Sequence, residues 1–211
     1  MGVIVGDDGA GFLRHPEPDV HIAGDPLGRT YTPDAVALAC CRALAAMGCD
    51  PSVVREPCVG GGAFVRAVAE VWSQQVVVGG WIDAADIDPN APGLGMASRY
   101  GEASMVDATD PVPAPGLTPR YDLIITNPPF GEEAGDVDVR IYAAQRPACD
   151  WLALLMPIEH ACLKRWAEPM QSAVIVPLTG RVWSVVRGMA LYVWGPGLRP
   201  LHPPITHGGR A

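Results

Sequence analysis

Residues 127–130 (NPPF) have the side chains needed to bind and activate a planar amine. An amide or exocyclic nitrogen delocalises its lone pair, so it attacks poorly until acceptors engage its N–H groups. The Asn127 side-chain oxygen and the Pro128 carbonyl oxygen are two such acceptors, and the prolines restrict the backbone that carries them. Phe130 offers a flat apolar face for stacking. The same residues also suit a rigid loop beside the core.

A glycine-rich segment, residues 55–64 (REPCVGGGAF), joins an apolar run to a helical pattern. Glycines let the backbone turn tightly and approach a ligand, and the start of the following helix has unpaired N–H donors. Val65 stands where a GxGxxG motif needs its third glycine, which disfavours a dinucleotide. A tight turn that binds nothing fits the same glycines.

Two acids follow further apolar runs. Asp86 ends the run 81–86, where an acid can accept hydrogen bonds from ribose hydroxyls, and Asp88 competes with it for that role. Asp107 follows the run 103–106, where it can accept from an adenine amino group. Both segments also have the composition of ordinary turns.

Seven short apolar runs, each ending in a polar or glycine-containing turn, predict the strands that position these residues. The runs are 52–56, 81–86, 103–106, 121–126, 151–156, 172–176 and 189–194. Most are continuously apolar, as in parallel strands covered on both faces. Residues 177–188 are too few for a typical crossover helix, so the last two runs are predicted to pair antiparallel.

Helical spacing of apolar residues predicts a helix with Thr32 as its cap, Pro33 at its first position and Gly48 as its stop. Further helices are predicted over 62–72, 132–146 and 158–170, whereas the proline-rich link 107–120 cannot be a regular helix. This alternation predicts an α/β fold with helices on both faces of the sheet and a ligand site at the carboxyl ends of its strands.

Together the four segments resemble the class I S-adenosylmethionine-dependent amino-methyltransferases, most closely the phage-type adenine-N6 DNA methyltransferases. The resemblance covers about residues 30–195. It implies a Rossmann-like, seven-stranded, mostly parallel sheet with an antiparallel last strand. It also implies S-adenosylmethionine as cofactor, no metal, and transfer of the methyl group to the N6 amino group of adenine in DNA.

The resemblance assigns roles to individual residues. For the catalytic segment it implies Asn127, Pro128, Pro129 and Phe130. For the cofactor it implies Tyr31, Thr32, Pro33, Glu56, Pro57, Gly60, Gly62, Asp86, Asp107 and Asn127. Cys58 and Val59 depart from the small or polar residues frequent there, and no separate target-recognition domain follows, which leaves room for a separate specificity partner.

The charge is unevenly distributed along the chain, whose net charge is −8. Residues 1–138 hold 20 acidic and 7 basic residues, against 3 acidic and 8 basic in 139–211. The C-terminal third is therefore the candidate DNA-binding face, although solvated surface arginines explain the same composition. The candidate phosphate contacts are Arg140, Arg146, Lys164, Arg165, Arg181 and Arg187.

The remaining composition predicts a soluble cytoplasmic protein, in the host cytoplasm if the chain is phage-encoded. No apolar run approaches the roughly 20 residues of a membrane span, the N-terminus lacks a secretory signal, and the six cysteines form no CxxC pair. The histidines show no metal-binding spacing. We expect an irregular arm over 1–30, a methyltransferase domain over 31–195 and a flexible tail over 196–211.

Two other functions are compatible with the sequence. The same chemistry can act on a glutamine amide in a protein or on RNA, since both present a planar amide or amine. Alternatively, the chain is a non-catalytic methyltransferase-fold module that serves a partner.

Overall fold

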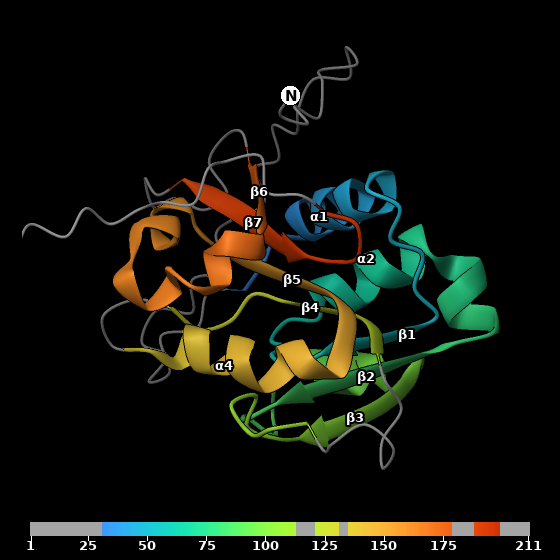
Figure 1. Cartoon of the computed structure of the whole chain (residues 1–211). Coiled ribbons are helices and arrows are strands. Elements are labelled where there is room, and N and C mark those ends of the chain that lie inside the picture. The colour runs from blue at the N-terminus through green and yellow to red at the C-terminus, as the bar shows by residue number, and fades with distance from the viewer. Residues whose placement is uncertain (1–30, 113–120, 131–134, 179–187, 199–211) are drawn as a thin grey trace, which may run out of the picture.

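The computed structural model describes residues 31–112, 121–130, 135–178 and 188–198 (Figure 1). The arm predicted over 1–30 lies outside these residues, as does most of the tail predicted over 196–211. The described residues form a single sheet with helices packed on its faces.

The sheet has the strand arrangement expected for a site at its carboxyl edge. Its strands are β1 (Val53–Glu56), β2 (Trp81–Asp86), β3 (Gly101–Met105), β4 (Tyr121–Thr126), β5 (Cys149–Pro157), β6 (Val174–Pro177) and β7 (Met189–Trp194). They form a 7-stranded sheet in the order β3-β2-β1-β4-β5-β7-β6. Strands β1 to β5 pair parallel, and β7 runs antiparallel to both β5 and β6. The predicted sheet and the antiparallel pairing of the last two runs are confirmed.

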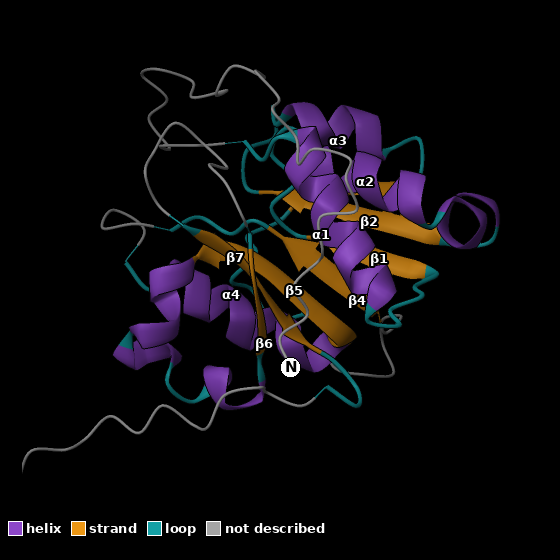
Figure 2. Cartoon of the chain, turned by 90° about the horizontal axis from the view of Figure 1, so that it is seen from above, coloured by secondary structure: helices purple, strands orange, loops and turns teal. Residues whose placement is uncertain are grey.

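Helices cover both faces of the sheet, as Figures 1 and 2 show. They are α1 (Asp34–Ala46), α2 (Ala63–Val71), α3 (Pro92–Ala97) and α4 (Val137–Gln145), with a π-helical turn at Ser73–Val78. Short 3-10 helices lie at Arg146–Ala148, Ile158–Cys162, Lys164–Trp166 and Pro169–Ser172. Helices α1 and α2 lie on one face and α4 on the other.

Alternate side chains of β5 and β7 enter two separate cores. Leu155 and Leu191 join the core under α1 and α2, whereas Leu154 and Tyr192 join the core beside α4. This period of two, with apolar residues on both faces, explains why these strands read as continuous apolar runs.

The start of the first helix differs from the prediction. Helix α1 begins at Asp34, and Pro33 is its N-cap residue with ψ 142, so Thr32 does not cap the helix. The Pro33 carbonyl accepts from the Val36 N–H at 3.0 Å and from the Ala37 N–H at 3.1 Å. A residue that precedes proline is disfavoured in the helical region, which keeps Thr32 outside the helix.

The helix predicted over 158–170 is wrong, because this segment forms three short 3-10 helices instead. Leu163 is extended, with φ -77 and ψ 136, and interrupts any continuous helix. Trp166 is fully buried, and its indole N–H donates to Asp138. Tertiary burial of this side chain outweighs the local helical spacing.

One helix differs from its prediction in extent, and two helical elements were not predicted. The helix predicted over 132–146 is shorter, since α4 begins at Val137, and residues 131–134 lie outside the described part. Helix α3 and the π-helical turn were not predicted, because the segment PGLGMA contains two glycines and shows no apolar period.

We predict that Leu155→Ala lowers the free energy of unfolding by about 2–5 kcal/mol, because Leu155 is 0% exposed in the central strand β5. Val78→Ala is the matched control, since Val78 is 76% exposed and its loss should change stability by less than about 0.5 kcal/mol. Urea denaturation measures both. Equal losses in the two variants would contradict the assignment of β5 to the core.

Candidate functional site

The carboxyl ends of β1, β2 and β4 bring three of the predicted site residues together. Glu56 ends β1, Asp86 ends β2, and Asn127 directly follows β4. Because β1 pairs parallel with both β2 and β4, these three residues lie at one edge of the sheet. The glycine loop 57–62 leaves the same edge and leads into α2.

Asp86 fixes the glycine loop against the end of β2. Its Oδ2 accepts the Gly60 backbone N–H at 2.9 Å, and its Oδ1 accepts the Asp88 N–H at 3.0 Å. The loop is tied down twice more, by Val59 N–H to the Ala85 carbonyl at 2.9 Å and by Gly93 N–H to the Gly60 carbonyl at 2.8 Å. A rigid loop therefore presents its backbone beside Asp86.

Gly62 has a backbone conformation that other residues rarely adopt, and its neighbours leave no room for a side chain. It is the N-cap residue of α2 with φ 78, in the left-handed region. A Cβ here would lie 2.0 Å from Met96 Cε and 3.1 Å from the Gly93 Cα. The backbone conformation and the lack of space for a Cβ are therefore sufficient to require glycine at position 62, whether or not a ligand binds beside it.

Tyr31 lies against the glycine loop. A Cβ placed on Gly60 would be 3.0 Å from Tyr31 Cδ1, and one on Gly61 would be 3.2 Å from Tyr31 Cδ2. The head of α1 is fastened to the same loop by Arg66, which donates to the Asp34 carboxylate at 3.0 Å and to the Gly61 carbonyl at 3.0 Å. The predicted element 31–33 therefore adjoins the loop, with Thr32 and Pro33 between Tyr31 and Asp34.

Three polar atoms at the ends of β1 and β4 are buried without a hydrogen bond of regular geometry among the described residues. They are Glu56 Oε2, Thr126 Oγ1 and Asn127 Oδ1. The Thr126 hydroxyl is close enough to the Glu56 carboxyl to lower its pKa, so these two groups satisfy each other in part, and Asn127 Oδ1 is left without an equivalent neighbour. An unpaired buried acceptor costs about 1–3 kcal/mol, so its presence at a strand end indicates a place for a polar ligand.

Glu56 has the electrostatics of a site for a positively charged group. Its burial raises the pKa of the carboxyl well above its usual range, the nearby Thr126 side chain and the Cys58 N–H lower it in part, and the Asp86 charge raises it further. Glu56 is 2% exposed, and its one backbone partner, the Cys58 N–H, is 3.4 Å away. An added cation would favour the ionised carboxylate.

The proline segment continues directly from β4. Pro128 is buried, Pro129 is exposed and Phe130 is half-buried. The Phe130 ring packs partly on the core under α1 and α2, and its centroid lies 6.1 Å from that of His160 at an interplanar angle of 85°. Part of the ring therefore remains accessible beside Asn127.

Asp107 serves a turn beyond β3. Its Oδ1 accepts from both the backbone N–H and the hydroxyl of Thr109, each at 2.8 Å, and these bonds lower the pKa of its carboxyl. The Thr109 hydroxyl also accepts from Arg140 Nη2 at 3.2 Å. Asp107 thus lies past the carboxyl end of β3 with one oxygen already engaged.

Sequence reasoning missed several residues around this edge. Thr126 was counted only as the end of a strand, although its buried hydroxyl lies close to the Glu56 carboxyl and next to Asn127. Ile87 and Met105 are 61% and 65% exposed at the ends of β2 and β3. Ile87 follows Asp86 and Met105 is the strand partner of Asp86, so the available signal was an apolar residue at the end of each strand, where turns usually carry polar residues.

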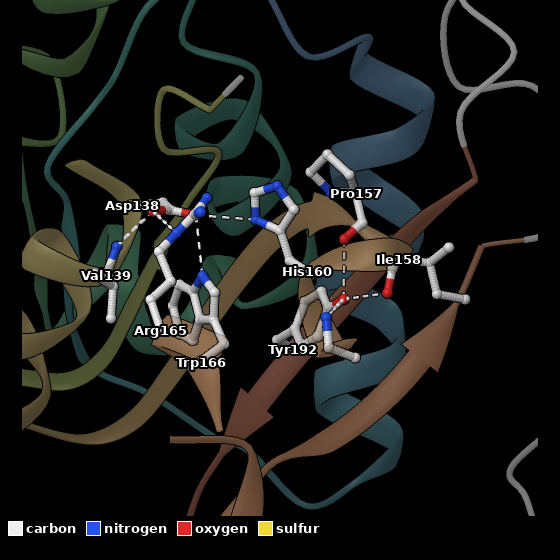
Figure 3. Close-up of polar contacts among 9 residues, drawn as sticks. Asp138, Val139, Pro157, Ile158, His160, Arg165, Trp166 and Tyr192 are labelled. Carbon is white, nitrogen blue, oxygen red and sulfur yellow. Dashed lines mark hydrogen bonds and ion pairs between the residues drawn. The ribbon is translucent and has the colours of Figure 1, made fainter. Parts of the chain in front are cut away.

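A second group of polar residues that the sequence did not reveal surrounds Asp138, at the start of α4 (Figure 3). His160, Arg165 and Trp166, all from the segment after β5, converge on its carboxylate. Long sequence separation hides such a cluster, since no local spacing links residue 138 to residues 160–166.

Other features of the described residues lie away from this edge. A surface hollow of about 410 Å³ is lined by residues of α2, the π-helical turn and Tyr100, and none of the predicted site residues lines it. Within the described ranges, no group of His, Cys, Asp and Glu side chains could hold a metal ion. No described helix has the length and apolar character that a membrane span requires.

Comparison with known proteins found similarity in structure only. No protein family and no curated protein matches the sequence. A protein from Listeria monocytogenes, named as a class I S-adenosylmethionine-dependent methyltransferase, superposes with a TM-score of 0.64 at 12% identity, over 82% of this chain and 63% of that one. A modification subunit from Vibrio vulnificus, named as part of a type I restriction enzyme, gives 0.58 at 17% identity, over 81% and 45%. A protein from Pyrococcus horikoshii named as an RNA methyltransferase gives 0.56 at 16% identity, over 79% and 87%.

These neighbours identify the fold. The described residues have the Rossmann-like class I methyltransferase fold that the sequence predicted. The chain spans 63% of the length of the Listeria protein and 45% of the Vibrio subunit, so the likeness concerns their shared domain.

We predict that Glu56→Gln stabilises the protein increasingly as the pH rises. Because the pKa of Glu56 is raised in the folded state, its contribution to stability is fully present below the unfolded pKa of roughly 4.3 and is lost as the pH rises toward the folded pKa. Glutamine does not titrate. Thermal unfolding should show a larger advantage of the variant at pH 8 than at pH 4.5.

Glu70→Gln is the control for this pH series, since the Glu70 side chain is 61% exposed. It should show no such pH dependence. An advantage of Glu56→Gln that is the same at both pH values would mean that Glu56 ionises normally in the folded protein.

Proposed function

We propose that the protein transfers the methyl group of S-adenosylmethionine to the N6 amino group of adenine in DNA. The observation that carries this proposal is the unpartnered Asn127 Oδ1 at the end of β4, with the buried Glu56 carboxyl at the end of the neighbouring strand β1, in a class I methyltransferase fold. The Glu56 carboxyl suits a cationic cofactor, and Asn127 Oδ1 suits an amine.

The residues at this edge fit the cofactor. S-adenosylmethionine supplies a methyl group made electrophilic by a sulfonium, and it also carries an ammonium group. The buried Glu56 carboxyl would bind the positively charged part, which would also favour its ionisation. Asp86 would accept from the ribose hydroxyls, and Asp107 would accept from the adenine amino group through the oxygen that Thr109 leaves free.

The glycine loop and its neighbours would complete the cofactor site. Gly60 and Gly62, with Pro57 at the start of the turn, bring backbone rather than side chains to the ligand. Tyr31, Thr32 and Pro33 would close the side of the loop that Tyr31 already contacts. The exposed side chain of Ile87, beside Asp86, offers an apolar surface for a purine ring.

Residues 127–130 would bind and orient the amine. The Asn127 Oδ1 and the Pro128 carbonyl accept from the two amino hydrogens, which localises the nitrogen lone pair and aims it at the methyl group. The restricted backbone at Pro128 and Pro129 keeps both acceptors in place. Phe130 stacks on the base, which must leave the duplex stack or come from single-stranded DNA.

DNA as the substrate is supported by two observations. The neighbours include modification subunits of type I restriction enzymes, from Vibrio vulnificus and Streptococcus thermophilus. The basic residues of the C-terminal third would provide phosphate contacts. Among the described ones, Arg165 is partly neutralised by Asp138, Arg146 donates to the Cys149 carbonyl and Arg140 donates to the Thr109 hydroxyl, which leaves Lys164 as the better candidate.

Sequence specificity would come from outside this domain. The chain matches only 45% of the Vibrio protein, which is named as a modification subunit of a restriction enzyme. We therefore include a separate specificity protein in the proposal, and we expect the protein to act in the cytoplasm.

A methyl-transfer assay on three substrate classes tests the proposal. Radiolabelled S-adenosylmethionine is incubated with DNA, RNA and a total protein extract, and the label should appear in DNA as N6-methyladenine. Label confined to RNA, as the neighbour named as an RNA methyltransferase would suggest, or to protein glutamine would overturn the choice of substrate. Absence of both transfer and cofactor binding would favour a non-catalytic module.

We predict that Asn127→Ala reduces kcat at least about 100-fold, because an acceptor for the amine is lost, while the Kd for S-adenosylmethionine changes less than about twofold. Asn90→Ala is the matched control, since Asn90 is exposed in the turn after β2. Single-turnover kinetics and calorimetry measure the two quantities. Normal turnover in Asn127→Ala would remove Asn127 from the mechanism.

We predict that Asp86→Ala weakens S-adenosylmethionine binding at least about tenfold, because charged acceptors of ribose hydroxyls and the anchor of the Gly60 N–H are both lost. Asp88→Ala should weaken it less than about threefold. Calorimetric titration of both variants decides which acid holds the ribose. A larger loss in Asp88→Ala would reverse the assignment.

A further inference from the structure

His160 contacts the aromatic ring that the proposed mechanism uses for stacking. The centroids of Phe130 and His160 are 6.1 Å apart at an interplanar angle of 85°, an edge-to-face arrangement. Phe130 follows β4, and His160 lies in the 3-10 helix after β5, the parallel neighbour of β4. The contact therefore joins the loops that follow two adjacent strands.

Asp138 holds the His160 ring from the other side (Figure 3). His160 Nδ1 lies 2.9 Å from Asp138 Oδ2, a close contact without the alignment of a regular hydrogen bond, between side chains that are 6% and 1% exposed. Burial alone would raise the pKa of the Asp138 carboxyl, but His160, Trp166, Arg165 and the Val139 N–H lower it to about 2. The carboxylate is thus ionised near neutral pH and attracts the imidazole.

The carboxylate itself has little freedom to rotate. Its Oδ1 accepts the Val139 N–H at 2.8 Å and Arg165 Nε at 3.3 Å. Its Oδ2 accepts the Trp166 indole N–H at 3.0 Å and Arg165 Nη2 at 3.3 Å. Because both oxygens are fixed, the direction in which Asp138 attracts His160 is fixed too.

The backbone that carries His160 is anchored separately by Tyr192 of β7, as Figure 3 shows. The Tyr192 hydroxyl lies 2.9 Å from the Pro157 and Ile158 carbonyl oxygens, between which it shares its proton. It accepts the Ala161 N–H at 3.2 Å. The main chain around His160 is therefore fixed, and its side chain is confined between Asp138 and Phe130.

We propose that His160 is a positioning residue that sets the orientation of the Phe130 ring, and through it the plane of the substrate base. The role of Phe130 as the stacking surface rests on the proposed function. A half-buried ring with one fixed neighbour loses less freedom when a base stacks on it. A ring held in one plane also keeps the amino group aligned with Asn127.

The network around Asp138 does not by itself require a histidine at position 160. Arg165 already supplies the opposite charge, and Trp166 and Val139 supply further donors to the carboxylate. The imidazole adds the contact with Phe130, which a purely structural partner of Asp138 would not make.

A double-mutant cycle tests this role in the wild-type chain and three variants. His160→Leu should lower the single-turnover rate of methyl transfer about tenfold, with the Kd for S-adenosylmethionine unchanged, because the stacking ring is misaligned. Phe130→Leu should lower the rate as well, and adding His160→Leu to it should change the rate less than about twofold. Additive effects would overturn the proposal, since His160 would then act independently of Phe130.

Leu44→Ala separates positioning from stability. Leu44 is 0% exposed in α1, and its loss leaves the donors to Asp138 and the contact between His160 and Phe130 in place. It should lower the melting temperature while the transfer rate stays within about twofold of wild type. A rate loss that followed the melting temperature across all variants would assign His160 a structural role only.

A spectroscopic measurement tests whether His160 orients the Phe130 ring, and it does not require the protein to be active as an enzyme. The chain contains three phenylalanines, so labelling with 4-fluorophenylalanine gives three ¹⁹F resonances, and the one lost in Phe130→Leu belongs to Phe130. His160→Leu should shift that resonance, whereas Cys162→Ser, an exposed change in the same 3-10 helix, should not. An unshifted resonance in His160→Leu would overturn the proposal.

The methyl-transfer assay and the ¹⁹F spectrum test the proposed function and the role of His160 separately. If the wild-type protein transferred no methyl group to any substrate, the proposed function would fall. The Phe130 resonance would still decide whether His160 orients the ring.

Discussion

The hydrogen bond from the Gly60 N–H to the Asp86 carboxylate ties the end of β2 to the loop after β1, and the geometry of the candidate site depends on this contact. Parallel pairing brings the strand ends to one edge, but it does not fix the loops that leave them. Asp86 does so by accepting from Gly60 and from Asp88 with different oxygens. A carboxylate that organises the loop is thereby also held ready for a ligand, because its position no longer depends on that ligand.

Folding leaves unfavourable terms at the same edge. Asn127 Oδ1 is a buried acceptor that no described residue satisfies, at about 1–3 kcal/mol, and the buried Glu56 and Thr126 side chains satisfy each other only in part. The apolar strands β4, β5 and β7, whose side chains are almost all buried, offset this cost. Burial in the two cores stabilises the fold enough for it to tolerate incompletely satisfied polar groups at the strand ends.

The sequence predicted the sheet well because its strands are apolar on both faces and end in polar turns. The runs at 81–86, 121–126 and 189–194 match β2, β4 and β7 residue for residue. The segment 158–170 was mispredicted as a helix, because burial of Trp166 and its bond to Asp138 act over a sequence distance that periodicity does not report. The strand-end residues Glu56, Asp86 and Asn127 were predicted from their type and place, and the structure brings them to one edge of the sheet. The closeness of Thr126 to Glu56 and the Asp138–His160 pair depend on three-dimensional neighbours, which local spacing does not report.

The alternation of β5 and β7 between two cores also fixes the register in which these two strands pair. If β7 slipped by one residue against β5, Tyr192 and Trp194 would turn toward α1, where Ala37, Cys40 and Cys41 are packed with no exposed surface. The same slip would withdraw the Tyr192 hydroxyl from the backbone around Ile158. A misaligned chain would therefore lose its packing and the support of the Phe130 loop in a single event, so molecules with the wrong register would be both unstable and functionally silent.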